Sequence, residues 1–253
     1  MIATRRGARR LVDVPPETLL EIELGHIDTA NHIEQMAVSM ENLFRSVEPS
    51  LRHRAEELRG LPFISSLRAA GNILFEERGK SAYVDHVDRY RDLPRGWQAF
   101  AIDADSALDL AQALSAATVF ADDDHFAVRE WAWLGFRRHV LESPRDAVRE
   151  LAQLARHPSP FVRRFSVEAS RPRSVWGVHV GYLKMCPDVI EPTLLALVGE
   201  THPYVIRSIV NWIRDASRQR PDWAHAMTSA LLTRVDEPQF RQRLLALTDV
   251  AAG

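Results

Sequence analysis

Charged side chains that could bind an anion or stabilise a cation are concentrated in one segment of this 253-residue chain. Between Arg156 and Arg220 there are ten Lys and Arg residues against five Asp and Glu residues, a net charge of +5, whereas the rest of the chain carries −7. Arginine is suited to phosphate contacts, and carboxylates stabilise developing positive charge. The asymmetry is compatible with one basic face on an acidic body, and equally with solvated helix surfaces.

Apolar residues recur at intervals of three and four along the chain, and no stretch sustains an alternation of period two. This pattern is typical of amphipathic helices packed on one another, so we expect an all-α fold. A polar, Asp-rich stretch at 83–96 predicts a connection between two helical regions. The expected helices are 18–24, 29–44, 48–58 and 63–78 before it and 104–119, 126–141, 144–156, 161–170, 188–198, 204–218, 223–233 and 239–250 after it.

The helices after this connection fall into pairs, and the second helices of three pairs align with one another. With Val128, Val162 and Val205 in register they read VREWAW, VRRFSV and VIRSIV, at spacings of 34 and 43 residues. These periods bracket the two-helix unit of HEAT and armadillo repeats, whose pairs bury their apolar faces only by stacking on neighbours. The sequence therefore predicts a HEAT-like helical-repeat solenoid, an α-α superhelix, with the second helices lining a concave face.

Two long runs on consecutive repeats resemble the signature of the AlkC/AlkD-type DNA glycosylases, and of the AlkC type in particular. Residues 162–179 read VRRFSVEASRPRSVWGVH, similar to that family's succession of Glu, Ala/Gly, Ser/Thr, Arg-Pro-Arg and Trp. Residues 204–221 read YVIRSIVNWIRDASRQRP, similar to its element with Tyr-Val, Ser-Val, Asn-Trp/His and Asp-x-Ser-Lys. With VREWAW one repeat earlier, the resemblance covers 101–230 in order and spacing.

The resemblance implies a hydrolase of base excision repair that cleaves the N-glycosidic bond of cationic alkylated bases in double-stranded DNA. The expected bases are of the 3-methyladenine type, with 3-methylcytosine a further candidate, and the damaged nucleotide is not flipped into a deep pocket. Breaking this bond builds positive charge on the deoxyribose, which nearby carboxylates stabilise while they orient the attacking water. The matched positions imply Asp215 and Glu168 as the catalytic pair, with Glu130 in support.

The same matched runs imply the side chains that hold the DNA. Trp176, after the Arg-Pro-Arg turn, is expected to lie against the lesion, where its indole ring favours a cation; Trp131 and Trp212 are further candidates. Pro172 ends the helix and turns the following residues toward the groove. Phosphate contacts are expected from six arginines: Arg163, Arg171, Arg173, Arg207, Arg214 and Arg218.

Each of these side chains has an ordinary structural alternative. The acids can pair with neighbouring arginines on solvated helix surfaces, and the tryptophans can fill gaps between repeats. Arg214 also stands where the family usually has Asn, and beside Asp215 it is expected to lower that carboxyl's pKa or to screen its charge. Two other functions therefore stay open: a DNA-structure binder without catalysis, and a protein-interaction scaffold.

The chain is expected to divide into a basic flexible arm at 1–14, an N-terminal helical region at 15–96 and a repeat region at 97–253, the last two forming one continuous solenoid. Four arginines make the arm either a mobile tail that contacts DNA or a strap pinned to the surface. They are Arg5, Arg6, Arg9 and Arg10.

Several patterns that would indicate other chemistry are missing from the sequence. The histidines lack the spacing of metal ligands, cysteine occurs once, and there is no Gly-rich phosphate loop, so no metal and no cofactor is expected. No apolar stretch approaches the ~20 residues of a membrane span, and the N-terminus lacks an apolar signal core. We therefore expect a cytoplasmic monomer without membrane contact, associated with the nucleoid when it is on DNA.

Overall fold

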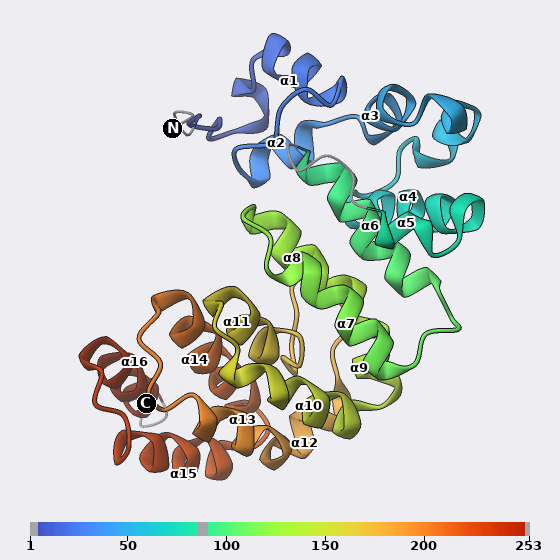
Figure 1. Cartoon of the computed structure of the whole chain (residues 1–253). Helices are drawn as coiled ribbons and strands as arrows, with labels where there is room; N and C mark the ends of the chain where they lie inside the picture. Colours follow the sequence, from blue (N-terminus) through green and yellow to red (C-terminus); the bar gives the residue numbers. More distant parts are fainter. Residues whose placement is uncertain (1–4, 86–90, 251–253) are drawn as a thin grey trace. The chain divides into compact units, whose positions relative to one another are not determined.

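The computed structural model describes residues 5–85 and 91–250, and these residues form helices and connecting loops without a β-strand (Figure 1). This confirms the predicted all-α fold. The described residues pack into two compact units. One contains the chain up to Leu108 together with Asp124–Gly135, and the other contains Asp109–Asp123 and the chain from Phe136. None of the described helices combines the length and the apolar character that crossing a lipid bilayer requires.

The first unit is built around helix α6, which lies between α4 and α8. Two glycines permit the close approach: a Cβ on Gly71 of α4 would lie 2.6 Å from the Trp97 carbonyl oxygen, and one on Gly135 of α8 would lie 2.1 Å from that of Ala99. Every residue of α6 from Asp92 to Ile102 is buried. The helices of this unit are η1 Leu11–Asp13, α1 Pro16–Glu23, α2 His32–Ala37, α3 Met40–Val47, η2 Pro49–Leu58, α4 Phe63–Arg78, α5 Ser81–Val84, α6 Asp92–Ala104 and α8 Phe126–Gly135.

The second unit shows the predicted stacking of successive helix pairs. Helix α11 packs against α14, and α14 packs against α15 and α16, so the second helices of two consecutive pairs lie side by side (Figure 1). Both helices bury apolar side chains, among them Phe165 of α11 and Ile209 of α14. The helices of this unit are α7 Leu110–Ala121, α9 Arg137–Glu142, α10 Pro144–Ala152, η3 Gln153–Arg156, α11 Pro160–Glu168, α12 Gly181–Met185, η4 Pro187–Ile190, α13 Glu191–Ala196, α14 Pro203–Ser217, α15 Pro221–Leu232 and α16 Pro238–Val250.

The expected connection at 83–96 was wrong at both ends, because α5 extends to Val84 and α6 begins at Asp92. Asp92, which favoured a loop in the sequence, is instead buried. Its carboxylate accepts hydrogen bonds from the Thr29 backbone N–H at 3.1 Å and from the Thr29 hydroxyl at 2.5 Å. Pro94 is tolerated because it lies in the first turn, where a backbone N–H has no helical acceptor. Residues 86–90 of the stretch lie outside the described residues.

Two expected long helices are interrupted. The helix predicted at 29–44 is two helices, because Val38 is extended and the Ser39 hydroxyl accepts the Asn42 N–H at the start of α3. The helix predicted at 126–141 breaks after Gly135, where the chain passes from the first unit to the second. The segment 48–58 is helical as expected but forms the 3₁₀ helix η2.

The described part of the N-terminal arm lies along the surface as a strap. The Arg5 guanidinium binds the buried carboxylate of Glu34, with nitrogen–oxygen distances of 2.5 and 2.7 Å. The Asn31 side chain donates to the Ala8 carbonyl oxygen at 2.8 Å. These contacts connect residues 5–8 to the start of α2, and residues 1–4 of the predicted arm lie outside the described residues.

The glycine contacts predict the cost of adding one methyl group. We expect Gly135→Ala to lower the free energy of unfolding by about 2–3 kcal/mol, because the new Cβ meets a backbone oxygen that cannot rotate away. Gly181→Ala is the control: nothing lies within 4 Å of its added Cβ, so it should be neutral or slightly stabilising. Urea unfolding of both variants measures the difference, and equal stabilities would contradict the close packing of α8 on α6.

Candidate active site

A single arginine joins two of the predicted catalytic carboxylates. Arg171, just beyond the end of α11, donates from Nη1 to Glu168 Oε1 at 2.8 Å. Its Nε and Nη2 both lie 2.8 Å from Asp215 Oδ2 on α14. Glu168 is the last residue of α11, so the packing of α11 against α14 brings the two acids to opposite sides of one guanidinium. We call Glu168, Arg171 and Asp215 the carboxylate network.

Glu168 is enclosed on all sides of its carboxylate. It is 5% exposed, and Oε2 accepts the Ser208 hydroxyl at 2.5 Å and lies 3.5 Å from Arg164 Nη2. Burial opposes its ionisation, but the charges of Arg164 and Arg171 and the bonds from Ser208 and Arg171 outweigh it and hold the pKa of Glu168 below its usual range. Glu168 is therefore ionised and has no free access to a substrate, which corrects its expected catalytic role: it positions Arg171.

Asp215 is the more accessible acid of the network, with 13% of its side chain exposed. Its hydrogen bonds from side chains of the described residues all fall on Oδ2, which leaves Oδ1 for a water or a substrate. Burial raises the pKa of Asp215, assisted by the negative charge of Glu168 and opposed by Arg171 and Arg173. A carboxylate that is costly to ionise gains from a cation nearby, so this oxygen suits a positively charged partner.

Arg214 does not act on Asp215 as the sequence suggested. Its side chain is exposed and donates from Nη1 to the Asn211 side-chain oxygen at 3.0 Å. The cations that lower the pKa of Asp215 are Arg171 and Arg173, while burial has the larger, raising effect. The expected depression of this pKa by Arg214 was wrong, because adjacent residues on a helix point in different directions.

Two of the three tryptophans predicted to bind the lesion belong to the core. Trp212 is fully buried, donates to the Ser170 carbonyl oxygen at 3.2 Å, and packs on Trp223 with ring centres 5.5 Å apart. Trp131 is 3% exposed and packs on Phe63 in the first unit. Both substrate-binding assignments were wrong, since neither indole face can be reached. Trp176 is different, because 45% of it is exposed on the loop after Pro172.

Half of the arginines predicted to bind phosphates are occupied within the protein. Arg163 pairs with Glu200 at 2.6 Å and also donates to the carbonyl oxygens of two residues before α11. The Arg171 guanidinium is bound to Glu168 and Asp215. Arg173 is half-buried and donates to the Gln219 side chain at 2.8 Å and to the Asp215 carbonyl oxygen at 3.3 Å. The assignment of Arg163 and Arg171 to phosphate binding was therefore wrong. Arg173 uses part of its guanidinium to bind the backbone of α14.

The other three arginines form one exposed stripe along α14 and its C-cap residue, Arg218. Arg207, Arg214 and Arg218 are all exposed and follow one another at intervals of seven and four residues, which places them on the same face of the helix. At about 100° per residue, Asp215 lies roughly 80° around the axis from the middle of this stripe. We call these three residues the arginine stripe; it borders the face of α14 that carries Asp215.

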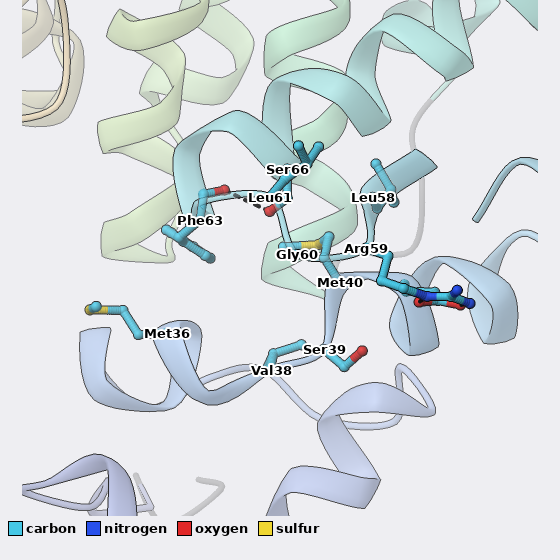
Figure 2. Close-up of a pocket in the computed structure, with 11 residues that line it drawn as sticks. Met36, Val38, Ser39, Met40, Leu58, Arg59, Gly60, Leu61, Phe63 and Ser66 are labelled. Carbon is cyan, nitrogen blue, oxygen red and sulfur yellow. Dashed lines mark hydrogen bonds and ion pairs between the residues drawn. The ribbon is translucent and has the colours of Figure 1, made fainter. Parts of the chain in front are cut away.

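Glu130 belongs to α8 of the first unit, where Oε2 accepts the Trp133 Nε1–H at 2.8 Å. Its expected support of the other two acids stays a prediction. The first unit also contains a cavity of about 250 Å³ between α2, α3, the end of η2 and the start of α4 (Figure 2). Met36, Met40 and Phe63 contribute apolar side chains to its lining, and Glu41 with Arg59 supplies a charged edge. None of its lining residues belongs to the carboxylate network.

The sequence interpretation overlooked Ser208 and Arg137, and it considered Arg164 only in the alternative in which the acids pair with neighbouring arginines. Ser208 and Arg164 bind Glu168, and the Arg164 guanidinium lies 4.1 Å from the centre of the Tyr204 ring. Arg164 had a local signal, since an Arg four residues before a Glu faces it on a helix. Arg137 binds backbone carbonyls far away in the chain, and such a contact leaves no pattern in the sequence. In the part of the chain that the structure describes, no three His, Cys, Asp or Glu side chains are grouped to hold a metal ion.

Comparison with known proteins relates a part of the chain to a bacterial protein. The chain is similar to the uncharacterized protein YhaZ of Bacillus subtilis (strain 168), with 32% identity over 85 residues. This match covers 34% of the chain and 24% of YhaZ, so it spans about a quarter of that relative. No family model matches the chain, and no solved structure matches it.

The enclosure of Glu168 predicts its contribution to stability. Glu168→Gln leaves Arg164 and Arg171 with an uncharged partner, and we expect it to lower the free energy of unfolding at neutral pH by about 3 kcal/mol. Because the folded protein holds this pKa below the unfolded value of 4.5, the contribution is complete above that value and is lost as the pH falls through the folded pKa.

Glu142→Gln is the matched control for this variant, because Glu142 pairs with Arg138 on an exposed surface of α9. Its stability should stay within about 0.5 kcal/mol of the parent protein. Urea unfolding between pH 3 and pH 8 compares the two variants. If Glu168→Gln were as stable as the control at pH 7, Glu168 would not be an ionised, buried partner of the arginines.

Proposed function

We propose that the protein is a DNA glycosylase that hydrolyses the N-glycosidic bond of cationic alkylated bases in double-stranded DNA. The observation that carries this proposal is the environment of Asp215: a partly accessible carboxylate with one unbound oxygen, held in place by Arg171 and bordered by exposed arginines. The runs that resemble the AlkC type contain these residues. The proposed base class is that of 3-methyladenine.

In the proposed reaction the arginine stripe binds the phosphates of one strand, and Trp176 lies against the damaged nucleotide. The bond between the sugar C1′ and the base nitrogen breaks, and its electron pair leaves with the base, which thereby loses its positive charge. Asp215 stabilises the oxocarbenium-like sugar through charge and accepts a hydrogen bond from the water that adds to C1′. The water's proton passes to Asp215 or to solvent, and no metal or redox partner is required.

One observation favours a second candidate function, a DNA-structure binder without catalysis. Arg171 holds Oδ2 of Asp215 in a salt bridge, and this positive charge offsets part of the field that a cationic sugar would feel. A protein of that kind would keep the arginine stripe and bind duplexes, but it would release no base. The two functions therefore differ in a single measurement, the release of free base from methylated DNA.

Asp215→Asn tests the proposed chemistry. With methylated duplex DNA and excess protein, the parent should release 3-methyladenine, and the variant should be slower by about 10²–10³-fold, the usual effect of removing one electrostatic group from an active site. Because the raised pKa disfavours the charged form in the fold, the variant should be at least as stable as the parent at neutral pH. Release by the parent should decline as the pH falls through the pKa of Asp215, which lies above its ordinary value of 3.8.

Asp222→Asn is the control for that experiment, because Asp222 is an exposed acid at the start of α15 that pairs with Arg220. It should release base at the rate of the parent. Unchanged release by Asp215→Asn would contradict the assigned role of Asp215. If the parent binds the duplex but releases no base, the non-catalytic DNA binder is the function. If the parent neither binds the duplex nor releases base, the protein-interaction scaffold is the remaining function.

The arginine stripe predicts the salt dependence of DNA binding. Changing Arg207, Arg214 and Arg218 together to Gln should weaken binding of an undamaged duplex irrespective of its sequence. Plotted as log affinity against log salt, the slope should become shallower by about three, one for each phosphate that is no longer neutralised. Arg145, Arg149 and Arg241, changed together to Gln, serve as the control with equal loss of charge. An equal change of slope in both triple variants would show that only net charge matters and would contradict a phosphate-binding stripe.

A further inference from the structure

The loop at 172–180 carries large apolar side chains into water. Val175 is 88% exposed, Val178 66% and Trp176 45%. Such side chains would ordinarily fold back onto the protein, because exposing apolar surface is unfavourable. We call this segment the Trp176 loop, and something must hold it away from the core.

The two ends of the loop are joined, and its tip has a turn of its own. The Val180 N–H donates to the Pro172 carbonyl oxygen at 3.0 Å, which closes the segment at its base. The Ser174 hydroxyl accepts the N–H groups of Trp176 and Gly177, at 3.1 and 2.7 Å. These bonds give the loop a shape, but they do not fix its direction relative to the helices that carry Glu168 and Asp215.

Arg137 supplies the connection from the loop to these helices. This residue begins α9, is 3% exposed, and directs Nε and Nη2 to the Val178 carbonyl oxygen at 2.9 and 2.7 Å. Its Nη1 donates to the carbonyl oxygen of Ala169, the C-cap residue that follows α11, at 3.1 Å. One guanidinium therefore connects the end of α11, next to Glu168, to the far side of the Trp176 loop.

We infer that Arg137 is a positioning residue: by binding the backbone of Val178 and Ala169 together, it holds the Trp176 loop at a fixed direction from the carboxylate network. The planar fork of a guanidinium is needed, because three N–H groups must reach two carbonyl oxygens in one arrangement. The loop is thereby ordered before DNA binds, so Trp176 and Asp215 keep a constant separation.

The electrostatic surroundings agree with a cationic guanidinium that binds backbone oxygens. Burial and the neighbouring charge of Arg171 lower the pKa of Arg137 to about 10, against the opposite effect of Glu168 and Asp215. At neutral pH the guanidinium therefore remains protonated, with carbonyl oxygens as acceptors. Placing a buried cation on two backbone oxygens is costly in solvation, which a merely space-filling residue would avoid.

Amide hydrogen exchange of Arg137→Lys, with the whole chain, tests this inference independently of activity. Lysine retains the charge but not the fork, and we expect the amides of Gly177 and Val180 to exchange at least about tenfold faster, as the loss of a charge-assisted hydrogen bond implies. Amides within α14, such as Ile209 and Ile213, should keep their rates. Arg138→Lys is the matched control, because the neighbouring Arg138 contacts Glu142 at the surface, and it should leave the loop unchanged.

A kinetic comparison of the same variants rests on the proposed function. Arg137→Lys should lower the single-turnover rate of base release by about 10²-fold, the effect of a misplacement of roughly 1 Å, and leave undamaged-duplex affinity within about twofold. Unchanged loop exchange, a loss of protection that extends equally into α14, or a looser loop with an unchanged release rate would each overturn the inference. If the parent releases no base, the proposed function fails, and loop exchange alone decides the role of Arg137.

Discussion

Arg171 binds one carboxylate at the end of α11 and another in the last turn of α14, and the arrangement of the candidate site depends on this guanidinium. A planar group with five donors can serve both acids at once, which an ammonium group would do less well. Because Glu168 and Asp215 come from successive helix pairs, their common partner also connects the two helices. The interaction that holds the site together therefore also joins two neighbouring helix pairs.

The same network shifts the pKa values of two chemically similar acids in opposite directions. Glu168 has several positive and hydrogen-bonding partners, so its pKa lies below the usual range, whereas burial raises the pKa of Asp215. Pairs of carboxyl groups whose environments move their pKa values apart commonly have different roles. In the proposed reaction Glu168 remains a fixed anion that orients Arg171, and Asp215 keeps an oxygen for the reacting nucleotide and its water.

Hydrophobic periodicity was sufficient to predict the all-α fold, and the aligned runs placed Glu168 and Asp215 on neighbouring second helices. Trp212 was misplaced because the resemblance, and not periodicity, suggested that it binds the substrate; it lies on the buried face of α14, and its indole N–H meets the Ser170 carbonyl. The polar start of α6 favoured a loop because the acceptor role of Asp92 depends on Thr29, far away in the chain. Arg137 was missed because its acceptors are backbone oxygens, which every sequence contains.

The most direct test of the account is the affinity of the protein for a duplex with a positively charged pyrrolidine in place of one deoxyribose. A duplex with a neutral tetrahydrofuran at the same position is the reference. If Asp215 stabilises a cationic sugar, the protein should bind the pyrrolidine duplex at least about tenfold more tightly, since mimics of a charged transition state gain the most from such a group. Equal affinity for the two duplexes would contradict the central claim.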